Sequence, residues 1–207
     1  MPDTVGRRRQ ATEAALVRAA TELFVRDGFA RTTLASVADR AGVAERTLYV
    51  RFATKVDLFQ RVIEAAVVGD TDRTPLPERE WSIRAMSAAT LDARIAAFAD
   101  GVADMHERLG PLMAVNGEVE PSEPAVQSSA GAAREATMVF LRAFWESAAE
   151  ARLTPPETDL EWLIATSATL SAAETRLLVS RTLDWDRDEF RDWLAVSMHR
   201  LLAGSTR

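Results

Sequence analysis

Apolar side chains recur at helical spacing along most of this sequence, and this periodicity limits the possible folds more than any other feature. Residues 10–27 carry one such stripe, and Gly28 follows it as the expected C-cap of a helix. Alternation of β-branched residues is scarce, and glycine and proline fall between the periodic segments. We therefore expect an all-α protein of about nine helices with no strand. The stripe consists of Ala14, Leu16, Val17, Ala20, Leu23 and Phe24.

Capping signals and helix breakers predict where the other helices begin and end. Thr54-x-x-Asp57 and Asp186-x-x-Glu189 have the form of capping boxes, and Thr154-Pro155-Pro156-Glu157 resembles a strong helix start. Gly110-Pro111 predicts a break, while two prolines and six charges make residues 69–80 a predicted loop. The further helices are expected at 33–41, 44–52, 54–68, 88–108, from there to about 119, from about 122 to 152, at 154–182 and at 186–202.

The segment from Thr33 to Lys55 has the internal pattern of a helix-turn-helix. Gly42 joins two short helices, and the exposed positions of the second helix offer donors that can reach phosphates or base edges. Lys55 lies in the first turn of the next helix, where its amide and its ammonium can face a phosphate together. An ordinary helical hairpin is the alternative interpretation, and the exposed donors favour DNA binding over it. These donors are Arg46, Thr47, Tyr49 and Arg51.

A run of residues around this segment resembles the N-terminal domain of the TetR family of bacterial repressors. The resemblance covers about 50 of the 207 residues, and the rest of the chain is similar to the family only in its all-helical layout. The residues that carry it are Leu23-Phe24, Gly28-Phe29, Thr32-Thr33, Val37-Ala38, Ala41-Gly42-Val43, Thr47-Leu48-Tyr49, Phe52, Lys55 and Leu58-Phe59.

The resemblance implies a homodimeric repressor that a small apolar inducer releases from a palindromic double-stranded DNA operator. Residues 1–55 would form the three-helix DNA-binding domain and 54–68 a linking helix. Residues 69–207 would form the larger helical domain that binds the inducer and dimerises. By the family pattern, the residues that hold phosphates are Thr33, Thr47, Tyr49 and Lys55, and those that read bases are Glu45, Arg46, Val50 and Arg51.

The sequence departs from the family pattern at two positions. Ala44 replaces the frequent serine cap of the second helix, which should cost about 1 kcal/mol, and Glu45 partly offsets this loss by favouring the helix N-terminus. Arg46 stands where the family often has a small residue. A long cation there can pair with a guanine, with a phosphate contact as the equal alternative, and Val50 can touch a thymine methyl group.

The charges are distributed as a DNA-binding head and an acidic body would require. Residues 1–55 contain ten Arg/Lys and six Asp/Glu, whereas residues 56–207 contain fifteen and twenty-five, and the whole chain has a net charge of −6. Phosphate attraction requires local positive potential rather than a positive total. A non-specific nucleoid-type DNA binder, which is usually basic overall, is therefore disfavoured.

Composition also argues against an enzyme, the main competing class. The chain has no cysteine and two distant histidines, so neither a metal site, a cofactor nor a His-carboxylate catalytic group is expected. Phosphate-binding glycine loops and nucleophile elbows are absent from the sequence as well. No apolar run approaches the roughly 20 residues that span a bilayer, and the N-terminus lacks a signal-peptide pattern, which predicts a cytoplasmic protein without a membrane partner.

The acidic body is expected to hold the ligand site and the dimer surface. Aromatic and methionine side chains suit an adaptable apolar site, although plain core packing is the stronger alternative for any one of them. The ligand candidates are Phe98, Met105, Met113, Phe140, Phe144, Trp145 and Trp162, with His106 and Asn116 as possible polar contacts. The dimer candidates, on the final helices that pair subunits in proteins resembling this one, are Ser167, Ser171, Trp193, Val196 and Arg200.

Overall fold

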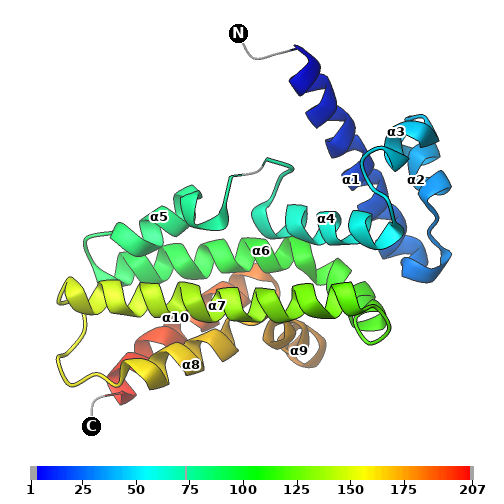
Figure 1. Cartoon of the computed structure of the whole chain (residues 1–207). Coiled ribbons are helices and arrows are strands. Elements are labelled where there is room, and N and C mark those ends of the chain that lie inside the picture. The colour runs from blue at the N-terminus through cyan, green and yellow to red at the C-terminus, as the bar shows by residue number, and fades with distance from the viewer. Residues whose placement is uncertain (1–3, 73, 206–207) are drawn as a thin grey trace. The chain divides into compact units, whose positions relative to one another are not determined.

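The computed structural model describes residues 4–72 and 74–205. Within these ranges the chain forms ten α-helices, one short 3-10 helix and no strand (Figure 1), which confirms the all-α prediction. The first four helices are α1 (Thr4–Arg31), α2 (Leu34–Ala41), α3 (Glu45–Tyr49) and α4 (Lys55–Val68). Those that follow are η1 (Leu76–Glu78), α5 (Glu80–Ser87), α6 (Leu91–Val119), α7 (Pro124–Glu150), α8 (Leu160–Leu170), α9 (Ala173–Leu183) and α10 (Arg187–Gly204).

These helices form two compact units. Unit 1 comprises residues 1–73 and 111–130, and unit 2 comprises residues 74–110 and 131–207. The long helices α6 and α7 therefore contribute to both units. Residues 111–130, which we expected in the ligand-binding domain, belong instead with the N-terminal helices. The reason is their apolar side, because Leu112, Val115, Val119 and Val126 are buried in the same core cluster as α1, α2 and α4.

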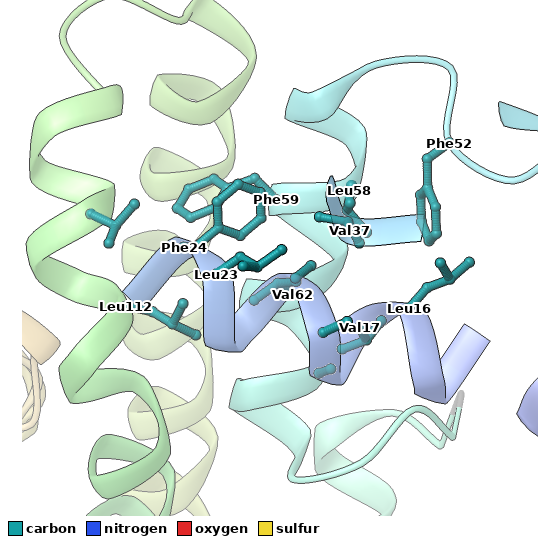
Figure 2. Packing of buried hydrophobic residues seen from close by; sticks show 14 of the residues in the cluster. Leu16, Val17, Leu23, Phe24, Val37, Phe52, Leu58, Phe59, Val62 and Leu112 are labelled. Atoms are coloured by element: carbon teal, nitrogen blue, oxygen red, sulfur yellow. The ribbon is translucent and has the colours of Figure 1, made fainter. Parts of the chain in front are cut away.

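The core of unit 1 fixes the angle at which the helix-turn-helix is held. The predicted stripe of α1 is buried there, and its side chains meet those of α2 and α4 (Figure 2). Phe24, Phe29 and Phe59 form an aromatic triangle with ring centroids 5.2 to 5.7 Å apart. Each fully buried side chain of this size contributes about 1.5–3 kcal/mol. The short helices α2 and α3 thus depend on tertiary burial rather than on their own length.

The core of unit 2 is built mainly from α6, α7, α8 and α10. Trp145 is fully buried, and its indole N–H donates to the Ser167 hydroxyl at 3.0 Å. The indole ring of Trp81, on α5, packs against α6 at Gly101. A Cβ at that position would lie 2.2 Å from the Trp81 ring, so only glycine allows this close approach. The indole therefore packs directly on the backbone of α6.

Two predicted features of the body between residues 74 and 119 differ from the structure. We expected a loop over residues 69–80 and a helix that begins at residue 88. No helix was expected over residues 81–87. The chain forms α5 there, and Ser82 and Ala85 are fully buried. We also expected a break at Gly110-Pro111, but α6 continues through Pro111. Leu109 and Leu112 are both buried beside this proline, and such burial stabilises a helix against the one hydrogen bond that proline removes.

The predicted helix over 154–182 is two helices with a later start. Residues 154–158 form no helix but contain one turn, in which the amide of Thr158 donates to the Pro155 carbonyl at 3.2 Å, and Asp159 caps α8 instead. The chain then bends at Ser171, which ends α8. Its amide and its hydroxyl both bond the Ser167 carbonyl, at 2.9 and 2.7 Å.

Candidate nucleic-acid interface

Local hydrogen bonds define both ends of α2. The hydroxyl of Thr33 accepts from the Ser36 amide at 3.1 Å, and the Thr33 amide donates to the Ser36 hydroxyl at 3.1 Å, which completes a capping box. Gly42 follows the helix with φ 66° and ψ 32°, in the left-handed region that favours glycine. The turn predicted at Gly42 is confirmed, and the cap and the turn together set the direction in which the chain enters α3.

The recognition helix, by which we mean α3, is short and presents most of its side chains to solvent. Ala44 precedes it without a side-chain cap, as predicted from its sequence. Leu48 is its buried residue and anchors it in the unit 1 core. The predicted DNA-contacting side chains Glu45, Arg46, Thr47, Tyr49 and Val50 are all exposed, with Tyr49 at 53% and Val50 at 80%. Exposed large apolar side chains beside an arginine are typical of a binding surface.

Lys55 begins α4 and its ammonium reaches back to the end of α1. Nζ donates to the carbonyls of Phe29 at 2.7 Å and Thr32 at 3.0 Å, and it lies 4.2 Å from the centre of the Phe29 ring. Partial burial lowers the pKa of Lys55, and Glu123 opposes the decrease. The structure thus ties this ammonium to main-chain carbonyls, so only the backbone amide of Lys55 points to a phosphate role in this conformation.

Comparison with known proteins agrees with this geometry. The sequence model of the bacterial regulatory proteins of the tetR family matches residues 16–62. The chain is 39% identical over 56 residues to TtgR, a helix-turn-helix transcriptional regulator of Pseudomonas putida, a match that spans only 27% of each chain. Residues 16–62 therefore match the N-terminal domain of the TetR family.

Two solved structures share the fold across nearly the whole chain. A TetR transcription regulator from Haloarcula marismortui has a TM-score of 0.69 with 15% identity, over 95% of this chain and 98% of the other. The fatty acid degradation regulator FadR from Bacillus halodurans has a TM-score of 0.67 with 16% identity, over 95% and 96%. At such low identity these likenesses concern the fold, and they extend it to both units.

Arg51 is the one predicted base-reading residue whose side chain is turned inward. Its guanidinium donates to the Arg9 carbonyl at 2.8 Å and lies 3.4 Å from the Glu13 carboxylate. Glu13 also accepts from Arg61 of α4 at 2.7 Å. The carboxylate therefore joins α1 to the turn after α3 and to α4. Because the Arg51 side chain is only 20% exposed, it serves this network rather than the exposed surface.

Sequence analysis missed the roles of Glu13 and Arg61. One signal was present, because Glu13 lies three and four residues before Leu16 and Val17 and so occupies the apolar face of α1. A carboxylate on a buried face normally has a cationic partner. The identity of that partner could not be read from spacing, since Arg61 is 48 positions away.

Five of the ligand candidates lie together in unit 2. Phe98, Phe144 and Trp145 are buried in its core, and Phe140 packs against Phe98 with ring centroids 5.8 Å apart. Met105 is partly buried against the same cluster.

The other ligand candidates do not join this cluster. Trp162 is 43% exposed on α8, and Met113 belongs to unit 1. Asn116, also in unit 1, is buried and donates to the Glu120 carboxylate at 3.2 Å.

His106 is buried on α6, and its Nδ1 has no hydrogen-bond partner among the described residues. Burial lowers the pKa of this imidazole to about 4, Arg176 adds to the decrease, and Glu174 opposes it. Its ring lies 5.6 Å from that of Phe190. The histidine is therefore neutral near pH 7, and it is a polar group inside an apolar core.

The dimer candidates fall into two groups. Ser167 and Ser171 are buried within one chain, so neither offers surface to a second copy. On α10, Val196 and Arg200 are exposed, whereas Trp193 is half-buried beside Phe190 with ring centroids 5.6 Å apart. Of the five dimer candidates, only Val196 and Arg200 therefore offer exposed side chains on α10.

Within residues 4–72 and 74–205, no helix has the length and apolar character needed to cross a bilayer. The same residues contain no cluster of three or more His, Asp or Glu side chains suited to a metal ion.

Proposed function

We propose that the chain is a sequence-specific DNA-binding transcriptional regulator and not an enzyme. The observation that supports this most directly is the exposed face of α3, held on a capped α2 by the left-handed turn at Gly42. A recognition helix held in this way enters the major groove with its N-terminal side chains against base edges. The neighbouring residues of the head then contact phosphates and fix the register.

The roles within this surface follow from side-chain chemistry. Thr33, Thr47 and Tyr49 contact phosphates, since hydroxyl groups at the rim of a recognition helix donate well to phosphate oxygens. Arg46 reads guanine through two parallel hydrogen bonds, and Val50 meets a thymine methyl group. Glu45 lies at the start of the helix, where its carboxylate can accept from a cytosine amino group.

Selection of binding sites from a pool of random duplexes tests this proposal. Wild-type protein should enrich one palindrome, with a guanine at the position that Arg46 reads. Arg46→Ala should relax the preference at that position by about 1–3 kcal/mol. Arg84→Ala, which removes an exposed arginine from α5 of unit 2, is the matched control and should leave the preference unchanged. Unchanged preference in Arg46→Ala would refute the base-reading role.

We further propose that the protein is a homodimeric repressor released by a small apolar molecule bound in unit 2. Two heads per dimer would reach successive major grooves about 34–36 Å apart. The ligand must bind the released state more tightly than the DNA-bound state, or it cannot shift the equilibrium. Residues 111–130 are suited to carry the response, since they continue α6 and begin α7 yet pack with the head.

Native mass spectrometry of protein purified from its host tests the dimer and the ligand together. A dimer with additional small-molecule mass supports both parts of the proposal, and adding that molecule should weaken DNA binding. A strict monomer at micromolar concentration would refute the two-fold operator.

A further inference from the structure

Three consecutive arginines, Arg7, Arg8 and Arg9, lie in the first turns of α1 and have no role in the helix-turn-helix surface. All three are exposed. Successive residues of an α-helix are turned by about 100°, so the three side chains spread over more than half of its circumference. Across residues 4–72 and 74–205, no carboxylate forms a salt bridge with any of them. Their charges are therefore available to an anionic partner.

The position of these arginines on α1 adds to that attraction. The first turn of α1 contains no acidic residue, although acidic side chains are the ones that a helix N-terminus favours. Cations there repel the positive end of the helix dipole. Both the arginines and the dipole would be stabilised by a phosphate group. The free protein thus keeps an unfavourable concentration of positive charge at this site.

A built network fixes this turn next to the recognition helix. Arg51 follows α3 by two residues, and its Nη2 donates to the Arg9 carbonyl at 2.8 Å. Glu13, one turn further along α1, lies 3.4 Å from Arg51 and accepts from Arg61 at 2.7 Å. The residues around this network also line a groove of about 330 Å³, formed by Arg9, Gln10, Glu13, Arg51 and Thr71.

We propose that Arg7, Arg8 and Arg9 form a second DNA contact, to backbone phosphates next to the bases that α3 reads. In this proposal Glu13 and Arg51 are positioning residues that hold the basic turn beside the recognition helix. Duplex DNA is the partner for two reasons. Arg51, two residues after α3, bonds directly to the Arg9 carbonyl, and the positive charge of the three arginines is complementary to phosphate. The inference rests on the proposed function, since it extends the same DNA-binding surface.

Salt dependence of binding tests the contact, because each phosphate contact contributes about 0.9 to the slope of log K against log salt concentration. The variant R7Q/R8Q/R9Q is compared with wild type on two probes, a short duplex of random sequence and the duplex that wild type selects. We expect its slope to be shallower by about 1 to 3 and its affinity to fall at least about tenfold on both probes. The factor should be similar for both, because phosphate contacts carry no sequence information.

The matched control is R84Q/R108Q/R181Q, which removes the same charge from exposed positions of unit 2. Its slope should stay close to that of wild type. If R7Q/R8Q/R9Q keeps the wild-type slope, or if the control loses as much, the second contact is refuted while the helix-turn-helix proposal stands. If wild type binds neither duplex, the proposed function itself fails.

The positioning role is tested by combining the two sets of substitutions. Glu13→Gln weakens the bond to Arg51, and Arg51→Met removes the bond to the Arg9 carbonyl. In either background, R7Q/R8Q/R9Q should change the slope by less than it does in wild type. Circular dichroism identifies any variant whose head has unfolded, and the other background then decides. If R7Q/R8Q/R9Q changes the slope as much in the folded Glu13→Gln and Arg51→Met backgrounds as in wild type, the turn needs no positioning by these residues.

Discussion

Acidification should destabilise unit 2 through His106. His106 is 3% exposed on α6, and burial lowers its pKa to about 4 from an ordinary value near 6.5. Arg176 also disfavours the charged form, whereas Glu174 favours it. Between these two pKa values the unfolded chain binds a proton that the folded chain does not. The free energy of unfolding therefore falls as the pH drops from about 6.5 towards 4, and it is unaffected above that window.

The two pKa values set the size of the effect. With these pKa values for the folded and the unfolded chain, the free energy of unfolding should be about 2 kcal/mol lower at pH 5 than at pH 7.5. The total decrease over the full window is about 3 kcal/mol. Glu174, Glu161 and Asp188, whose pKa values are lowered, add most of their loss below about pH 4.5. Variants without the imidazole are therefore needed to assign the loss above pH 5 to His106.

Tryptophan fluorescence is the suitable assay because all five tryptophans belong to unit 2. They are Trp81, Trp145, Trp162, Trp185 and Trp193. Urea unfolding of wild type at pH 7.5 and at pH 5 should show the loss. His106→Gln and His106→Leu cannot titrate and should show little of it. If either folded variant loses as much stability as wild type over this range, burial of the imidazole is not the cause.

Three further substitutions test contacts within each unit. Gly101→Ala places a methyl group against the Trp81 ring and should lower the stability of unit 2 by about 1–3 kcal/mol, seen in urea unfolding. Ser167→Ala leaves the buried N–H of Trp145 without its acceptor and should cost about 1–3 kcal/mol in the same assay, while Ser167→Thr should retain most of the stability. Lys55→Arg keeps the charge but should destabilise unit 1 by about 1 kcal/mol, seen in thermal unfolding by circular dichroism. An unchanged unfolding midpoint would contradict the stabilising role of the bonds from Lys55 Nζ to the carbonyls of Phe29 and Thr32.

Most features whose hydrogen bonds close within four residues were predictable from the sequence, although the helix start predicted at Thr154 does not form. The capping boxes at Thr54 and Asp186 and the turn at Gly42 occur as expected, because each partner lies within the same turn of chain. The exposed face of α3 was predictable for a similar reason, since helical spacing alone separates Leu48 from its neighbours.

Features that depend on tertiary contacts were not predictable in this way. Pro111 should end a helix by its own chemistry, yet buried neighbours on both sides keep α6 continuous. Arg51 is in a position typical of base contacts, but its carboxylate partner is 38 residues away on α1. The segment 111–130 looked like part of the body because sequence order suggested it, whereas its apolar side completes the core of unit 1.

Lys55 is the single lysine among 25 basic residues, and the geometry around it explains why arginine does not serve there. Its ammonium lies among carbonyls of the segment that follows the kink at Gly28, at 2.7 Å from Phe29, 3.0 Å from Thr32 and 3.5 Å from Ala30, above the Phe29 ring. A compact ammonium directs three hydrogens tetrahedrally and can satisfy such converging acceptors, whereas a guanidinium is a planar fork. Loss of Lys55 would therefore reduce DNA binding by loosening α4 from α1, even without a phosphate contact of its own.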